Sequence, residues 1–264
     1  MGVKTPLSLQ EAQTLFPNYS LTNLQATTNG VIDTTYVTEK YVLKKYERSI
    51  EKRIEEDAKR LEFFSKHQLH VPKLLAKSKE WYLYERLLGE SPKSIRYYHI
   101  QALARFMAQL HTLTKTQRNS SAFLAQYNID EYLSFLKKDF FFYYKFLEPL
   151  KAFKLPCDGF IHGDIFKDNT LFYREKIAVF DFIDGGCGAF SFDVAVALMA
   201  FNPYNKSSFR TLFLQTYNQH SKKKLTHTEL QRSLHIATKL YMLLRIHKTK
   251  QAQNAKKLLK PYIK

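Results

Sequence analysis

The sequence lacks several features that would place it in a special class of protein. Its 264 residues include only two cysteines, Cys157 and Cys187, which are too few for a disulfide framework and lack the spacing of metal ligands. We therefore interpret them as two thiols, buried or incidental. No stretch of eighteen apolar residues occurs, and the first thirty residues lack the basic, apolar and small-residue regions of a signal peptide. These absences predict a cytoplasmic protein without a membrane partner.

Acidic residues are scarce toward the end of the sequence. The formal net charge is +17, and Glu229 is the only acid beyond Asp193, whereas residues 206–264 hold fourteen lysines and arginines. These cations are scattered among apolar positions, and no nucleic-acid motif accompanies them. We interpret them as a solvated basic face that raises the local concentration of small anions, and we do not expect a nucleic-acid partner.

The first third of the chain carries the pattern of strands. An apolar content of 45% is ordinary for a globular protein. Residues 24–38 and 40–46 are rich in β-branched and aromatic side chains, with the turn signal Asn29-Gly30 inside the first range. This pattern predicts a strand, a turn and a second strand. Residues 81–92 predict a further strand that runs into a connection rich in glycine and proline.

Helical periodicity dominates the remainder of the sequence. Apolar residues recur at helical spacing over residues 49–68, which predicts an amphipathic helix ended by Pro72. The same period predicts a helix over residues 100–113 and a helical stretch over residues 130–153, and the last seventy residues read as two or three more helices. We therefore predict an α+β fold with a small strand-containing lobe over residues 1–88 and a larger helical lobe over residues 89–264.

The residues that point to chemistry lie in the second half of the chain. Asn169 follows His162-Gly163-Asp164 closely, and Asp181 ends the apolar run 177–180 twelve residues later. A carboxylate that takes a proton from a hydroxyl, an amide oxygen and a second carboxylate at a strand end suit metal-assisted phosphoryl transfer. Asp164 is the candidate catalytic base, which accepts or orients the acceptor hydroxyl. Asn169 and Asp181 offer the hard oxygen ligands that Mg²⁺ prefers.

The spacing after Asp181 bears on the size of the acceptor. Asp193 lies only twelve positions after Asp181, and no Ala-Pro-Glu sequence follows. A protein kinase needs more room there for its activation loop and peptide platform. We therefore expect a small-molecule alcohol as the acceptor.

These residues carry a resemblance that runs nearly end to end. His162-Gly163-Asp164 and Asn169 are similar to the catalytic loop of the aminoglycoside phosphotransferase and choline kinase superfamily, and Phe180-Asp181-Phe182 is similar to its metal-binding strand end. The resemblance implies a two-lobed, protein-kinase-like fold with a small antiparallel-sheet lobe and a larger, mainly helical lobe. It also implies an alcohol phosphotransferase that uses ATP and Mg²⁺. His162 and Asp193 would then support the catalytic loop.

The resemblance extends to the nucleotide site. Lys44, near the end of a predicted strand, matches the lysine that meets the α- and β-phosphates. Its acidic partner on the next helix is either Glu56 or Asp57, and no glycine-rich loop is visible beyond Asn29-Gly30-Val31. The resemblance further implies three residues at the adenine ring, two through their backbone and one beside it: Glu85, Leu87 and Tyr84.

Within the superfamily, the sequence most resembles the bacterial homoserine kinases. The matching stretches are 29–36, 46–48, 181–195 and 243–247. This resemblance implies transfer of the γ-phosphate to L-homoserine, giving O-phospho-L-homoserine in threonine biosynthesis. Homoserine is a zwitterion, so its carboxylate needs a cation, and Arg245 is the candidate.

Other acceptors and a non-enzymatic role stay open. An aminoglycoside is polycationic and wants an acidic cleft, which the single acid of the last seventy residues disfavours. Choline or ethanolamine wants aromatic rings, and residues 140–144 hold five in succession, although most of these would be packing residues. In a different class, the chain would be a catalytically silent kinase fold that acts as a basic binding module.

Overall fold

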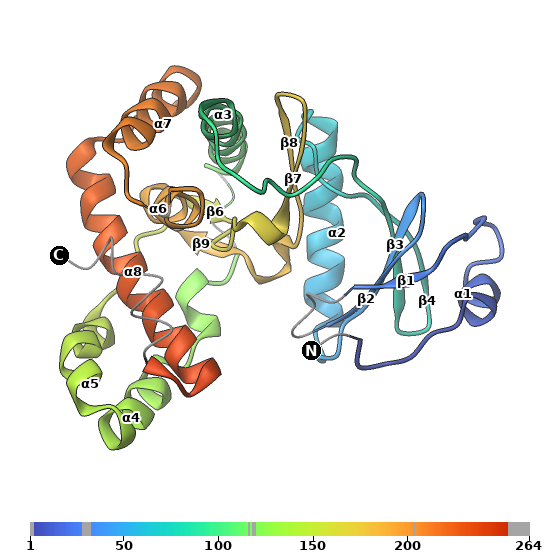
Figure 1. Cartoon of the computed structure of the whole chain (residues 1–264), viewed down its shortest axis with the longest axis horizontal. Helices are drawn as coiled ribbons and strands as arrows, with labels where there is room; N and C mark the ends of the chain where they lie inside the picture. The colour runs from blue at the N-terminus through green and yellow to red at the C-terminus, as the bar shows by residue number, and fades with distance from the viewer. Residues whose placement is uncertain (1–2, 28–32, 116, 118–119, 203, 253–264) are drawn as a thin grey trace. The chain divides into compact units, whose positions relative to one another are not determined.

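A computed structural model describes residues 3–27, 33–115, 117, 120–202 and 204–252 of the chain (Figure 1). The chain divides into two compact units. Unit 1 consists of Met1–Ser91, Thr170–Arg174 and Ala178–Ile183, and unit 2 consists of Pro92–Asn169, Glu175–Ile177 and Asp184–Lys264. The contiguous lobe boundary at residue 88 stays a prediction.

Unit 1 is built on a five-stranded antiparallel sheet in the order β1-β2-β3-β5-β4. Its strands are β1 (Gln25–Ala26), β2 (Thr34–Val37), β3 (Tyr41–Lys45), β4 (Leu74–Ser78) and β5 (Trp81–Glu85). The predicted strand pair is confirmed, because Thr35 of β2 lies opposite Lys44 of β3. The turn signal Asn29-Gly30 lies outside the described residues. The sequence pattern did not reveal β4.

Two helices accompany the sheet in unit 1: α1 (Leu9–Leu15) and α2 (Glu51–Lys66). The predicted amphipathic helix is confirmed as α2, which buries Ile54, Leu61 and Phe64 on one face. It ends before Pro72 because Gln68 adopts a left-handed backbone with φ 64°. The core on the α1 side of the sheet consists of Ala12, Phe16, Leu21, Tyr36, Leu43, Trp81 and Leu83.

The strand period decides which face of the sheet carries Lys44. Leu43 is fully buried in the α1 core, and neighbouring side chains of a strand point to opposite faces. Lys44 therefore lies on the face opposite α1. The sequence of β3 thus supplies a core residue and a charged residue from adjacent positions.

Unit 2 is mainly helical. Its α-helices are α3 (Tyr97–Thr114), α4 (Ile129–Asp139), α5 (Phe141–Leu147), α6 (Phe190–Phe201), α7 (Ser207–His220) and α8 (His227–Thr249). Helix α3 packs against α7, and α6 packs against α8. Nearly every side chain of α6 is buried, as expected for a helix that is apolar all round. The predicted helices after residue 193 are confirmed.

The helical stretch predicted over residues 130–153 is interrupted. Phe140 leaves the helical region with φ −144° and ψ 54°, so that it ends α4 and precedes α5. A 3₁₀ helix, η2 (Glu148–Ala152), completes the segment. Three further 3₁₀ helices occur in the described residues: η1 (Phe123–Gln126), η3 (Lys167–Asn169) and η4 (Phe182–Asp184).

Short strands flank the predicted catalytic loop. Strand β6 (Gly159–Ile161) pairs with β9 (Gly186–Gly188), and β7 (Thr170–Tyr173) pairs with β8 (Lys176–Val179).

The prediction of two thiols is wrong, because Cys157 and Cys187 form a disulfide with a Cα–Cα distance of 5.2 Å. Pairing of β6 with β9 places Phe160 opposite Cys187 and brings the segment before β6 alongside it. Sequence spacing alone carries no sign of that pairing.

The described residues thus form an α+β fold whose antiparallel sheet lies in the N-terminal region, as predicted. Within the described parts of the chain, no helix has the length and apolar character needed to cross a membrane.

Candidate active site

The segment that follows β6 is held by a buried carboxylate. Asp193, in the first turn of α6, is fully buried. Its Oδ2 accepts the backbone N–H of His162 at 3.1 Å, and its Oδ1 accepts that of Gly163 at 2.7 Å. Two successive peptide groups are therefore fixed by one side chain, which sets the path of the chain into Asp164.

Asp193 keeps its charge despite its burial. Burial alone would raise its pKa, but the hydrogen bond from His111 and the electrostatic interactions with His111 and His162 outweigh that effect, so the pKa is lowered. His111 Nε2 lies 3.0 Å from Asp193 Oδ2, and His111 Nδ1 lies 2.8 Å from the Tyr217 hydroxyl. The imidazole also stacks on Phe190 with 4.2 Å between centroids. The sequence reading missed His111, although a histidine in the apolar stripe of a predicted helix was a signal.

Asp164 and Asn169 lie together in unit 2. The Asp164 side chain is exposed. Asn169 Nδ2 donates to the Asp164 carbonyl at 2.9 Å and to Asp164 Oδ2 at 3.1 Å. Asp164 N–H in turn faces His162 Nδ1 at 3.2 Å. Because Asn169 binds the loop through its amide nitrogen, its carbonyl oxygen is the atom available to a metal ion.

Gly163 occupies a position that demands glycine. Its φ is 74°, in the left-handed region that side chains other than glycine rarely adopt. A Cβ atom here would also overlap the ring of Phe123, which is buried in η1. The turn before Asp164 is therefore specified by backbone conformation and by packing together.

Lys44 and Asp181 form an ion pair within unit 1. Lys44 Nζ lies 2.7 Å from Asp181 Oδ1 and 3.9 Å from Asp33 Oδ2. Burial acts to lower the pKa of Lys44, but the Asp181 and Asp33 carboxylates outweigh it and the pKa is raised. The sequence reading did not single out Asp33.

Asp181 has an unusual backbone. It follows β8 with φ 69°, a conformation that costs energy for a residue other than glycine, although aspartate tolerates it better than most. Its side chain keeps 38% of its surface exposed. Such outliers concentrate at functional sites, where the surrounding structure maintains them.

The structure treats the two candidate acids of α2 differently. Glu56 is exposed, whereas Asp57 is 4% exposed and pairs with Arg60 at 3.2 Å. Burial raises the pKa of Asp57 to about 7; the charge of Asp181 adds to this effect, while those of Arg60 and Lys44 oppose it. Of these two acids, only Asp57 has a pKa that the charge of Lys44 affects, and the ion pairs of Lys44 itself are with Asp181 and Asp33.

The predicted adenine residues lie at the end of β5. The hydroxyl of buried Tyr84 is 3.0 Å from that of Tyr46, and Lys44 Nζ lies 4.7 Å from the Tyr46 ring centroid. Glu85 N–H already donates to Lys73 O at 2.9 Å, and Leu87 is half-buried. Contact of Tyr84, Glu85 and Leu87 with adenine stays a prediction.

Arg245, on α8, lies beside the loop that contains Asp164. It is half-buried, and its guanidinium carbon is 5.8 Å from the centroid of the Phe166 ring. One turn earlier, the Tyr241 hydroxyl donates to the Gly163 carbonyl, and its ring lies 5.4 Å from that of Phe166. One face of α8 thus meets the loop on both sides of Asp164. The sequence reading did not single out Tyr241.

The aromatic run of residues 140–144 does not gather around one point. Phe141 and Phe142 are exposed, at 54% and 78%, and the Tyr144 hydroxyl donates to Glu148 at 2.7 Å.

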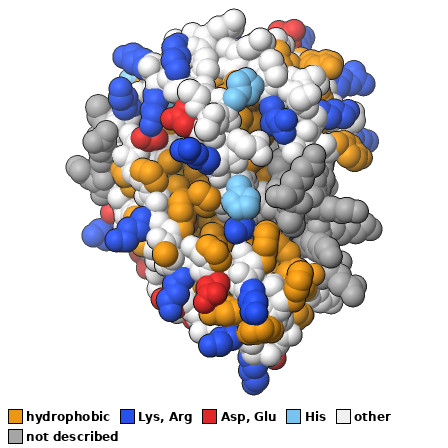
Figure 2. All heavy atoms as spheres, turned by 90° about the vertical axis from the view of Figure 1, so that its left-hand side faces the viewer, with side chains coloured by type: hydrophobic (Ala, Val, Ile, Leu, Met, Phe, Trp, Pro, Cys, Tyr) orange, Lys and Arg blue, Asp and Glu red, His pale blue; other side chains and the backbone are white. Residues whose placement is uncertain are grey.

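Figure 2 shows lysines and arginines spread among apolar side chains on the face of unit 2 that carries α7 and α8. They do not form one block there.

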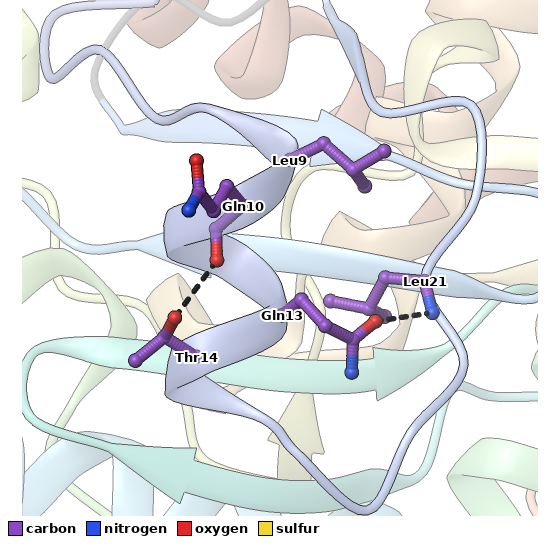
Figure 3. A pocket seen from close by; sticks show the side chains of 5 residues that line it. All are labelled: Leu9, Gln10, Gln13, Thr14 and Leu21. Atoms are coloured by element: carbon purple, nitrogen blue, oxygen red, sulfur yellow. Dashed lines mark hydrogen bonds between the residues drawn. The ribbon is translucent and has the colours of Figure 1, made fainter.

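A shallow pocket beside α1 is lined by Leu9, Gln10, Gln13, Thr14 and Leu21, and Gln13 Oε1 accepts the Leu21 N–H at 3.1 Å (Figure 3). None of the predicted site residues lines it. In the described part of the chain, no three histidine, cysteine or acidic side chains are grouped to hold a metal ion.

Several solved structures are similar to the chain. They include the ADP-bound aminoglycoside phosphotransferase APH(2'')-Ib, with a TM-score of 0.66, 17% identity and coverage of 97% of this chain and 98% of that one. The amicoumacin kinase hAmiN, in complex with AMP-PNP, Ca²⁺ and amicoumacin, has a TM-score of 0.73, 18% identity and coverage of 96% and 90%. The choline kinase LicA from Streptococcus pneumoniae has a TM-score of 0.64, 16% identity and coverage of 95% and 96%. These likenesses confirm the predicted protein-kinase-like fold.

The sequence comparisons address the family. A search of curated proteins found no match. The description "phosphotransferase enzyme family" belongs to a family model that matches residues 24–231, which is most of the chain. The loop held by Asp193 and the ion pair of Lys44 with Asp181 agree with that match. The chain belongs to the phosphotransferase enzyme family.

Proposed function

We propose that the protein is an ATP- and Mg²⁺-dependent kinase that transfers the γ-phosphate to the hydroxyl of a small molecule. The observation that carries this proposal is the loop in which Asp193 holds the His162 and Gly163 peptides while Asp164 stays exposed. An exposed carboxylate on a rigid backbone suits the orientation of an acceptor hydroxyl, where geometry matters more than basicity.

The chain carries the side chains that a nucleotide and a metal ion would need. Mg²⁺ supplies charge neutralisation between the phosphates when it is bound. The Asp181 carboxylate and the Asn169 amide oxygen are hard oxygen donors that fit it. Lys44 would meet the α- and β-phosphates, with Asp57 rather than exposed Glu56 as its acidic partner. Tyr84 and the backbone of Glu85 and Leu87 would meet adenine.

L-Homoserine is the acceptor that we propose first. Arg245 supplies a cation near the loop, where it lies over Phe166, two residues beyond Asp164. A guanidinium binds a carboxylate through two parallel hydrogen bonds, which favours an amino acid over choline or an aminoglycoside. The product would be O-phospho-L-homoserine.

The proposal is tested by coupled ADP release with Mg-ATP and a panel of acceptors: L-homoserine, L-serine, L-threonine, choline, ethanolamine and kanamycin. We expect turnover with homoserine, and Asp164→Ala should reduce it by about 10²–10⁴-fold. Asp168→Ala is the matched control, because Asp168 is an exposed acid in the same loop. Turnover that survives Asp164→Ala would overturn the mechanism.

The results with the other acceptors test the kinase activity separately from the choice of homoserine. Turnover with another alcohol would keep the kinase and discard homoserine. No ADP release with any acceptor of the panel, together with salt-sensitive binding to DNA, would favour a catalytically silent binding module instead.

The role of Arg245 has its own test. Arg245→Ala should raise KM for homoserine by about tenfold or more, because it removes a charge-assisted pair with the carboxylate. Arg232→Ala removes the same charge from an exposed position of α8 and should leave KM unchanged. An equal effect of the two variants would show that only overall charge matters.

A further inference from the structure

We propose that Tyr241 is a positioning residue for Asp164: its hydroxyl, by holding the Gly163 carbonyl, fixes the peptide plane from which the Asp164 side chain departs. This inference rests on the proposed function, in which Asp164 orients the acceptor hydroxyl. It concerns only residues of unit 2.

Tyr241 is a buried residue that contacts the loop containing Asp164. The side chain is 7% exposed and lies in the second half of α8. Its hydroxyl donates to the Gly163 carbonyl, and its ring lies 5.4 Å from that of Phe166. Tyr241 therefore contacts the chain just before and just after Asp164.

The peptide group between Gly163 and Asp164 is held at both of its polar ends. The Gly163 carbonyl and the Asp164 N–H belong to the same planar unit. Tyr241 binds the carbonyl, and the N–H faces His162 Nδ1 at 3.2 Å. Both polar ends of the plane are held, so the backbone at Asp164 has little freedom to rotate.

Removal of the Tyr241 hydroxyl would take this donor away from the Gly163 carbonyl. Gly163 is buried, its N–H is taken by Asp193 at 2.7 Å, and its φ of 74° is permitted to glycine. A buried carbonyl that loses its donor is costly, and rotation of the peptide toward another donor would relieve that cost. Such a rotation would carry the Asp164 carboxylate with it.

The protonation state of Tyr241 suits this role. Burial raises its pKa well above the ordinary value, and the negative charge of Asp164 raises it further. The phenol therefore remains a donor at every pH at which the protein would work. The pair is a permanent tether and not a titrating switch.

The test compares two buried tyrosines. Tyr36→Phe is the matched control, because Tyr36 is also 7% exposed and its hydroxyl accepts the Leu7 N–H at 2.9 Å in unit 1. We expect both variants to lose a similar few degrees of melting temperature. Tyr241→Phe should in addition lower kcat by about tenfold or more, with KM for ATP and acceptor nearly unchanged, because a misplaced catalytic group costs rate. Tyr36→Phe should retain the wild-type kcat.

A double variant shows whether the effect passes through Asp164. In an Asp164→Ala background, the substitution Tyr241→Phe should have no further effect on the residual rate. Full additivity would overturn the proposal, as would a wild-type kcat for Tyr241→Phe. A Tyr241→Phe protein that fails to fold, beside a folded Tyr36→Phe protein, would also overturn it, because the hydroxyl would then serve stability. Retained turnover in Asp164→Ala alone would instead count against the proposed function.

Discussion

At the scale of single residues, helix α2 carries a buried acid, Asp57, that pairs with Arg60. Asp57 is 4% exposed, and its pKa is raised to about 7, chiefly by burial. Its ordinary value in an unfolded chain is near 4. An acid whose pKa rises on folding is more stably accommodated in its protonated form, so its contribution to stability depends on pH.

We predict that the free energy of unfolding of the wild type falls as pH rises, and that this fall is absent in Asp57→Asn. The contribution of protonated Asp57 is fully present below about pH 4 and is lost as pH rises through about 7. Urea unfolding at several pH values should show a wild-type loss of roughly 2–4 kcal/mol that the variant lacks. Glu55→Gln, at an exposed position of the same helix, should retain the wild-type profile. A variant with an unchanged profile would contradict the prediction.

The sequence predicted those candidate site residues that belong to one short motif. The order and spacing of His162, Asp164, Asn169 and Asp181 needed no tertiary information. The pairing of Lys44 with Asp181 spans 137 positions, and only the resemblance to a family suggested a common site. Asp33 and Tyr241 escaped detection because their contacts are set by how distant segments pack.

At the scale of elements, long periodic segments were predicted well and short ones were not. Helices α2 and α3 have clear apolar stripes and were expected. Strand β4 was missed because five residues of mixed character carry no distinctive alternation. The break at Phe140 was missed because its aromatic neighbours continue a helical pattern while the backbone at that residue departs from it.

The N-terminus of α8 offers an element-scale prediction. Thr226 caps the helix: its hydroxyl accepts the Glu229 N–H at 3.1 Å, and Glu229 Oε2 accepts the Thr226 N–H at 2.8 Å. Thr226→Ala should therefore reduce the free energy of unfolding by about 1 kcal/mol, measured by urea denaturation. Thr228→Ala, an exposed position in the same first turn, should cost little. Equal losses would show that the cap contributes nothing.

At the scale of the whole molecule, a covalent link joins two segments of unit 2 that are distant in sequence. The disulfide of Cys157 and Cys187 spans 30 positions, and the chain that it closes contains β6, the proposed catalytic loop and Asp181. A closed loop has less conformational entropy in the unfolded state, which stabilises the folded state.

We predict that reduction of this link lowers the free energy of unfolding by roughly 2–4 kcal/mol. Thermal unfolding with and without reductant would show the shift, and Cys157→Ser should resemble the reduced protein and be insensitive to reductant. Two reactive thiols in the denatured, unreduced protein would contradict the pairing.

The contact between Gly163 and Phe123 has a consequence for how this sequence could have diverged. A methyl group at position 163 would occupy the space of the Phe123 ring, and the backbone there disfavours any side chain. A lineage that replaces Gly163 would first need a smaller residue at position 123 and then a different turn into Asp164. The two positions should therefore vary together or not at all, and η1, which carries none of the proposed chemistry, is expected to share the evolutionary constraint of the loop beside it.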